Sequence, residues 1–268
     1  ELIALDGIGE VEPGNDLAGL IAGALDASGL TLADADCVVV TQKVVSKAEG
    51  MVRRLSEVEP SPRAIELGNR LGKEAELIEL VLSESREILR DERVLITETH
   101  HGFVCANAGI DASNLPEDGT VCLLPRDPDA SARGIRKELM EAGRDRWWGS
   151  ADNSGEGPAT PTTGPSIAGV VADSFGRAWR LGQAEVAIGC AGLVTADDWR
   201  GREDASGREL SATVIAVADE VAAAADLVRA KNSGVPAAVV RGLAHYVLAE
   251  DGPGASALRR PRSEDLFR

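Results

Sequence analysis

Hydrophobic residues follow two kinds of pattern along the chain, and the first is a short uninterrupted apolar run. A strand that is covered on both faces needs no polar positions, so such runs predict buried strands. They occur at 37–40, 94–96, 121–124, 167–172 and 235–240. A short strand at 1–5 and an alternating one at 211–218 complete the predicted set.

The second pattern is a recurrence of apolar residues every three or four positions, which predicts helices. Asp16 is expected to cap the first helix and Asp129 the third, because aspartate accepts hydrogen bonds from free helix N–H groups. Strands and helices intermix, so the predicted class is α/β, with α+β as the alternative and helices flanking mixed sheets. The predicted helices cover 16–28, 63–90, about 129–142 and 219–231.

Residues 144–166 break both patterns. Gly, Ser, Thr and Pro dominate RDRWWGSADNSGEGPATPTTGPS, and no apolar period survives in it. Such a composition predicts a mobile surface excursion or a hinge. We therefore expect a single domain over 1–268, with two lobes hinged near 144–166 as the alternative.

Composition narrows the class of protein. An apolar content of 44% indicates a globular chain, and a net charge of −16 argues against nucleic acid or an anionic membrane as a partner. The four cysteines are widely spaced and lie in apolar or small-residue runs, so they are expected to be buried and reduced. No apolar run reaches membrane-spanning length and no signal peptide is visible. These features predict a cytoplasmic protein.

The stretch at 94–114, VLITETHHGFVCANAGIDASN, is the first candidate for chemistry. It opens as a strand, passes through small residues and ends in Asp111, Ser113 and Asn114. An acid and an amide three residues apart can hold a metal ion and a polar ligand together, because hard cations take oxygen ligands. The alternative is a strand followed by a turn that Asp111 or Ser113 caps.

A second candidate follows the strand at 37–40, in TQKVVSKAEG. Lys43 and Lys47 lie four residues apart there, either in a loop that faces an anion or as two solvated lysines at a strand end. The chain contains neither GxxxxGK[ST] nor GxGxxG. A bound nucleotide would therefore be held by a less common arrangement.

A third candidate begins where the strand at 167–172 is expected to end. Asp173 and Ser174 follow that strand, and ligands in α/β proteins bind near strand ends. Arg177 and Arg180 could then clamp a phosphate or carboxylate bidentately. The alternative is a surface network of ion pairs.

The order of these blocks resembles the coenzyme F420:γ-glutamyl ligase family, whose enzymes add glutamate to the precursor of that deazaflavin coenzyme. The similarity spans almost the whole chain in family order. The matching stretches are VVVTQKVVSKAEG at 38–50, ITETHHGFVCANAGIDASN at 96–114, LLPRDPDASARGIR at 123–136, DSFGRAWRLGQAEVAIGCAGL at 173–193, DASGREL at 204–210 and VADEVAAAADLVRAKNSGVPAAVVRGL at 217–243.

The resemblance implies the unusual α/β fold of that family, a homodimer, and GTP and Mg²⁺ or Mn²⁺ at the site. It implies addition of L-glutamate to the coenzyme F420 precursor through an acyl phosphate, followed by extension of a γ-linked tail. Bacterial two-domain relatives carry a nitroreductase-like extension, and this chain is expected to lack one. The alternatives are the same chemistry on another acceptor carboxylate, or a nucleotide-binding protein that has lost turnover.

The resemblance also implies roles for individual residues. Asp111 and Asp173 match metal ligands, and Ser174 matches a hydroxyl that supports a second metal. Lys47 adds a catalytic positive charge, while Arg177 and Arg180 are expected to orient carboxylates or phosphates. The implied nucleotide contacts are Ile8, Gly9, Glu10, Val11, Gln42, Lys47 and Asn114.

One position departs from the family pattern. Many archaeal relatives have Gly-Gln or Gly-Glu near the end of the alanine-rich helix, where the second residue helps to hold the second metal. This chain has Ala230-Lys231 there, and a protonated lysine cannot ligate a metal. Either the second metal is held differently, or Lys231 contacts phosphate.

Overall fold

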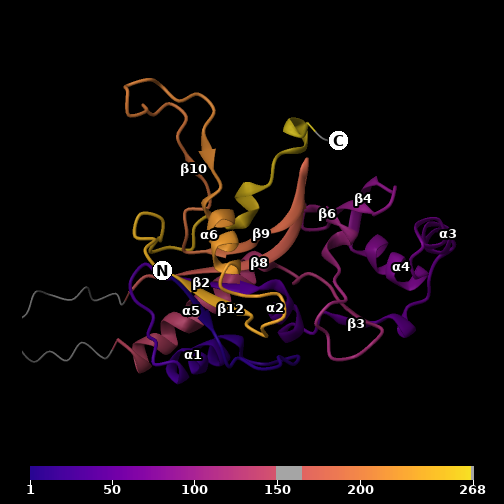
Figure 1. The fold of residues 1–268 in the computed structure, drawn as a ribbon, viewed down its shortest axis with the longest axis horizontal. Helices are drawn as coiled ribbons and strands as arrows, with labels where there is room; N and C mark the ends of the chain where they lie inside the picture. Colours follow the sequence, from indigo (N-terminus) through magenta and orange to yellow (C-terminus); the bar gives the residue numbers. More distant parts are fainter. Residues whose placement is uncertain (149–164, 267–268) are drawn as a thin grey trace, which may run out of the picture.

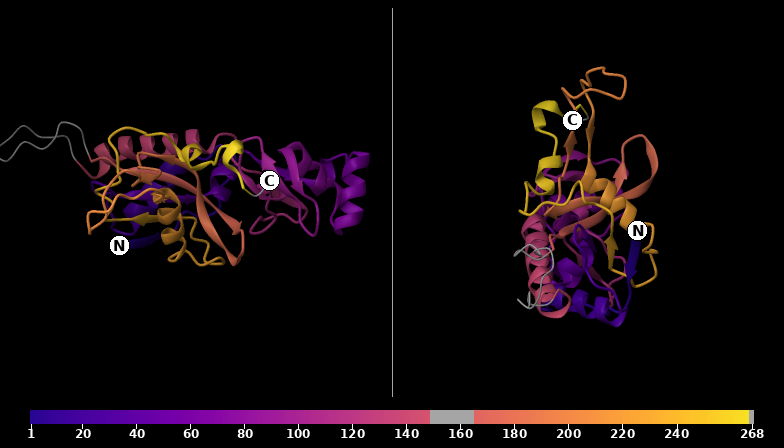
Figure 2. Two further views of the ribbon diagram at one scale, coloured as in Figure 1. Left: turned by 90° about the horizontal axis from the view of Figure 1, so that it is seen from above. Right: turned by 90° about the vertical axis from the view of Figure 1, so that its left-hand side faces the viewer.

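The computed structural model of the chain describes residues 1–148 and 165–266. Most of the predicted excursion at 144–166 lies outside these residues, and the hinge proposed there stays a prediction. Figures 1 and 2 show an elongated molecule with a large sheet toward one end and a smaller lobe of helices and strands at the other.

A five-stranded sheet forms the larger part, with the strand order β1-β12-β2-β8-β9. β2 and β8 are parallel while the other neighbours are antiparallel, which confirms the predicted mixed sheet. Its strands are β1 (Leu2–Leu5), β2 (Cys37–Thr41), β8 (Ala168–Arg177), β9 (Arg180–Ala191) and β12 (Ala237–Val240).

Helices cover both faces of this sheet, as the uninterrupted apolar runs require. Val38 and Val40 face the cluster that includes α1 and α5, whereas Cys37 and Val39 face the cluster that includes α6. Figure 1 shows α1 and α5 on one side of the sheet and α6 on the other. The helices are α1 (Leu17–Ala27), α5 (Pro128–Arg146) and α6 (Val217–Asp226).

The predicted single helix at 63–90 is wrong, because this stretch forms two helices and a strand. Gly72 ends the first helix in the left-handed conformation, with φ 65°, which glycine adopts without steric strain. The segment from Ser85 onward pairs with β5 instead of continuing a helix. The smaller lobe comprises α3 (Pro62–Leu71), α4 (Ala75–Ser83), β4 (Ser85–Arg90), β5 (Ile96–Thr99) and β6 (Val104–Ala106).

Short elements join the two parts and complete the fold. β3 pairs with β7, and β10 pairs with β11, each as a two-stranded ribbon. The remaining elements are α2 (Gln42–Ala48), β3 (Val52–Arg54), β7 (Thr120–Cys122), β10 (Asp197–Asp198), β11 (Val214–Ile215) and the 3₁₀ turns at Leu55–Glu57, Asn107–Gly109, Ala255–Leu258 and Arg262–Glu264.

Several predicted boundaries need correction. The strand expected at 211–218 is confined to β11, and the helix expected to reach 231 ends at Asp226. Asp16 caps α1 as predicted, by accepting the Gly19 N–H. Asp127 rather than Asp129 caps α5, because the Asp129 carboxylate accepts backbone N–H groups from Cys190, Ala255 and Ser256 instead.

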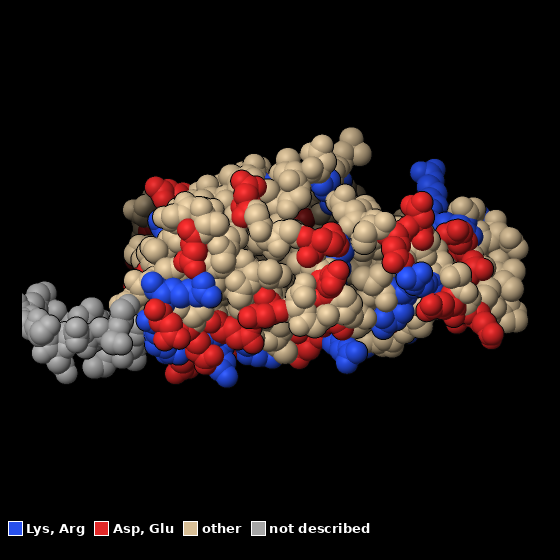
Figure 3. All heavy atoms as spheres, turned by 90° about the horizontal axis from the view of Figure 1, so that it is seen from below, with Lys and Arg blue, Asp and Glu red and all other residues tan. Residues whose placement is uncertain are grey.

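Two other expectations concern the whole chain. The four cysteines are free and buried, as their surroundings predict. Within the residues the structure describes, no helix is both long enough and apolar enough to cross a bilayer. Acidic and basic side chains are interspersed on the face shown in Figure 3, so the net negative charge is not gathered there into one block.

Arg136 on α5 ties the C-terminal segment to the sheet. Its guanidinium donates to the carbonyl oxygens of Ile167, Leu248 and Ala249 and pairs with Asp251, while the residue is 6% exposed. Arg136→Met should therefore lower the free energy of unfolding by about 3 kcal/mol, because several acceptors lose their donor. Urea denaturation measures this loss. Lys137→Met is the control, because Lys137 is the exposed neighbour of Arg136. Equal stabilities of the two variants would contradict the role given to Arg136.

Candidate active site

A cavity of about 520 Å³ lies where α2, the 7–11 loop, β8, β9 and the segment after α6 meet. Residues from distant parts of the sequence therefore share one space. Nine of the residues predicted to form the site line it: Gly9, Glu10, Val11, Gln42, Lys47, Asp111, Asn114, Asp173 and Ser174. Ile8, which was also predicted to contact the nucleotide, does not line the cavity. It belongs to the main apolar cluster and is 4% exposed.

The segment after β2 is the helix α2, so the predicted loop at this position is wrong. Its short length leaves no apolar period to detect, and it begins directly after the strand. Lys43 and Lys47 lie one turn apart on it, and neither is solvated as the alternative interpretation required. The Lys43 ammonium is 2.8 Å from Asp111, and the Lys47 ammonium is 2.6 Å from Glu10.

Gln42 fixes the start of α2 against the neighbouring ribbon. Its side-chain N–H group donates to Ser46 Oγ at 2.7 Å and to the Leu123 carbonyl at 2.8 Å. The side chain is 2% exposed, so these bonds hold it in one orientation at the cavity wall. A contact between Gln42 and a nucleotide stays a prediction.

Asp111 forms a capped turn, as one of its two predicted interpretations required. Its Oδ1 accepts the Ser113 backbone N–H at 2.7 Å, and its Oδ2 accepts from Lys43 and from the Ser113 hydroxyl. Burial raises the pKa of Asp111, but these hydrogen bonds outweigh it and leave the pKa below the ordinary value. The carboxylate is therefore charged at neutral pH and faces the cavity.

Asp173 carries the second carboxylate, on β8. Its pKa is raised to about 7, mainly by burial and then by the nearby charges of Glu185 and Asp111, against the opposing backbone hydrogen bond from Ser174. No Lys or Arg of the described residues forms an ion pair with it. The positive charge of Lys43 acts in the opposite direction and lowers the pKa, but by less than burial raises it.

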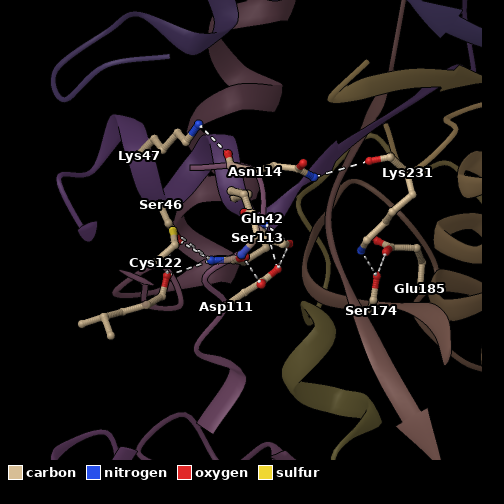
Figure 4. A network of polar contacts seen from close by, with 12 residues as sticks. Gln42, Ser46, Lys47, Asp111, Ser113, Asn114, Cys122, Ser174, Glu185 and Lys231 are labelled. Atoms are coloured by element: carbon tan, nitrogen blue, oxygen red, sulfur yellow. Dashed lines mark hydrogen bonds and ion pairs between the residues drawn. The ribbon is translucent and has the colours of Figure 1, made fainter. Parts of the chain in front are cut away.

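Glu185 and Arg229 form the buried back of the site, and neither was singled out from the sequence. Ser174 Oγ donates to Glu185 Oε1 at 2.5 Å, and Arg229 Nη2 is 3.6 Å from Glu185 Oε2 (Figure 4 shows the Ser174 contact). The residues are 7% and 4% exposed. In QAEVAIGC, Glu185 alternates with the apolar Ala184 and Val186, which on its own predicts a polar face and gave no signal of a buried glutamate.

Arg177 and Arg180 do not line the cavity. β8 continues through Asp173 to Arg177 instead of ending at Asp173, and the two arginines face each other across the β8–β9 turn. Both are exposed, and Arg177 donates to the Leu181 carbonyl. The structure thus separates them from the carboxylates beside which they were predicted to act.

The donor set suits a hard cation, although no three His, Cys, Asp or Glu side chains in the described part of the chain are grouped as a ready-made metal centre. Asp173 forms no ion pair with a described Lys or Arg, and Asp111 and Ser174 add oxygen atoms to the lining of the same cavity. Oxygen ligands of this kind are those that Mg²⁺ and Mn²⁺ prefer. Asp111, Asp173 and Ser174 are therefore the residues that could hold such an ion.

Comparison with known proteins identifies relatives over nearly the whole chain. The sequence model of the family described as F420-0:Gamma-glutamyl ligase matches residues 7–146 and 160–242. The chain is 44% identical to the coenzyme F420:L-glutamate ligase of Methanothermobacter thermautotrophicus, over 100% of this chain and 98% of that one. It is 40% identical to the protein of the same name from Archaeoglobus fulgidus, over 100% and 96% of the two chains. For the Methanopyrus kandleri protein of that name, the identity is 39% over 97% and 94%.

Proposed function

The chain belongs to the F420-0:gamma-glutamyl ligase family, and from this premise we propose that it joins L-glutamate to the coenzyme F420 precursor. The observation that carries the proposal is the similarity to proteins of that activity over nearly the full length of both chains. The cavity supports it, since its volume of about 520 Å³ lies within the range of small-molecule sites.

We propose GTP as the second substrate, because a carboxylate does not react with an amine unless one of its oxygens becomes a leaving group. In the first step, an oxygen of the acceptor carboxylate attacks the terminal phosphorus of GTP, which forms an acyl phosphate and releases GDP. The amine of glutamate then attacks the acyl carbon. The C–N bond forms, the C–O bond to phosphate breaks, and the amine loses a proton.

The residues of the cavity act in this scheme by position and charge. Gly9, Glu10 and Val11 line one part of the cavity, with the Lys47 ammonium paired with the Glu10 carboxylate. Asp111, Asp173 and Ser174 would hold Mg²⁺ or Mn²⁺ opposite. A bound ion supplies charge neutralisation for the phosphates. Such electrostatic and positional effects account for most of the acceleration in phosphoryl transfer.

Mass spectrometry of the coenzyme F420 precursor, incubated with the protein, L-glutamate, GTP and Mg²⁺ or Mn²⁺, tests the proposal. The expected product carries one added glutamate, and further additions appear as later peaks with γ-linkages on fragmentation. Samples without GTP, or with EDTA, are the controls and should give no product. Binding of GTP without any product would favour a protein that has lost turnover.

A further inference from the structure

The charged groups of the cavity are mostly paired with one another. Five carboxylates and four cationic side chains line it. Lys43 is bound to Asp111, Lys47 to Glu10, and Arg229 lies 3.6 Å from Glu185 and 3.9 Å from Asp226. These three cations already have carboxylate partners, so each would have to give up part of an ion pair to bind an anion.

Lys231 is the fourth cation, and it forms no ion pair with any described residue. Its ammonium group has one hydrogen-bond partner, Ser174 Oγ at 3.4 Å, which is a neutral atom at long range. An ammonium group has three N–H donors, so two remain for a ligand. Among the described residues that line the cavity, Lys231 is therefore the cation without a carboxylate partner.

The backbone holds Lys231 in place from the other side. The Asn114 amide donates to the Lys231 carbonyl at 3.4 Å, and Ser233 closes the turn by donating to the Ala230 carbonyl at 2.8 Å. Figure 4 shows Lys231 between Asn114 on one wall and Ser174 with Glu185 on the other. The side chain thus projects over the space between the 111–114 turn and β8.

We propose that Lys231 binds a phosphate oxygen of the nucleotide, an assignment that rests on the proposed function. The chain carries a net charge of −16, so the molecule as a whole repels an anionic nucleotide. Attraction must come from local cations, and an ammonium group without a carboxylate partner gives up no ion pair when phosphate arrives. Lys231 is exposed, so its ammonium group is accessible to an arriving phosphate, and a charge-assisted hydrogen bond to phosphate is stronger than a neutral one.

Calorimetric titration of GTP into the full chain in the presence of Mg²⁺ tests this assignment. Lys231→Ala and Lys231→Gln should bind GTP at least about tenfold more weakly, because a charge-assisted hydrogen bond is lost. Lys231→Arg should retain most of the affinity. The dependence of affinity on salt should be less steep for Lys231→Gln than for the unchanged protein.

The variants separate charge from structure. Glutamine can still donate to Ser174 Oγ, so a purely structural role predicts normal binding by Lys231→Gln, and that result would overturn the proposal. Equal losses in Lys231→Arg and Lys231→Gln would do the same. Lys137→Ala, an exposed lysine on α5, controls for the change in net charge, and thermal melting of each variant verifies folding. An unchanged protein that binds no GTP would overturn the proposed function, and this inference with it.

Discussion

Asp173→Asn is expected to lose nearly all ligase turnover and yet to be more stable than the unchanged protein at neutral pH. The activity falls because the substitution removes the carboxylate that has no cationic partner and faces the cavity. The stability rises because the charged carboxylate is buried, and because it lies near the like charges of Glu185 and Asp111. An asparagine of the same shape carries no charge to repel.

The pH dependence follows from the direction of the pKa shift. The folded-state pKa of Asp173 is about 7, against 3.8 for the free group, so the folded protein binds a proton that the unfolded chain has lost in this range. The free energy of unfolding therefore falls as pH rises from about 4 to 7. The gain from Asp173→Asn should be absent below pH 4 and complete above pH 7, with an upper bound of about 4 kcal/mol.

Thermal melting across this pH range, with EDTA present, measures the stability effect, and the glutamate-addition reaction measures turnover. Asp145→Asn, an exposed acid on α5, is the matched control and should change neither quantity. Near-normal turnover by Asp173→Asn would place the phosphate-activating site elsewhere. A lower melting temperature at pH 8 would instead mean that the carboxylate supports the fold.

The central sheet could be predicted from the sequence because its strands are buried on both faces. Both faces of β2 and β12 are covered, so neither strand needs polar positions, and the sequence shows each one as an uninterrupted apolar run. The residues concerned are Val38 to Val40 and Ala237 to Val240. The approximate helix pattern at 63–90 failed for the opposite reason. Its residues pack on a small lobe in which half-buried positions occur in a helix and in a strand alike.

The site was predictable as a set of residues but not as a set of pairings. Family resemblance selects Asp111, Asp173 and Lys47, and all three line one cavity. Nothing along the chain indicates that Glu185 would sit opposite Ser174, because that contact depends on the register of the β8–β9 hairpin. The same register explains why Arg177 and Arg180 lie beyond the cavity, since β8 runs past the position at which it was expected to end.

Gly189→Ala is expected to produce the largest loss of stability. Gly189 lies on β9, where the first turn of α5 crosses the sheet, and an added Cβ would lie 2.0 Å from the Pro128 carbonyl oxygen and 2.3 Å from its carbon. Both atoms belong to the backbone, so no side-chain rotation can relieve the overlap. Moving α5 away would also break the bonds from Cys190 and Ala255 to Asp129.

The sequence does not indicate that α5 lies so close to β9 at Gly189, because AIGCAG is an ordinary run of small residues. Gly189→Ala is therefore a strict test of the fold. The loss should reach about 3 kcal/mol or more, equivalent to roughly 10 °C in melting temperature. Gly134→Ala, on α5, is the control, since nothing lies within 4 Å of its added Cβ. It should be neutral or stabilising by about 0.5–1 kcal/mol, because alanine favours the helix. Equal melting temperatures of Gly189→Ala and Gly134→Ala would mean that α5 does not cross the sheet at this distance. The hydrogen bonds from Cys190 and Ala255 to Asp129 would then also be wrong.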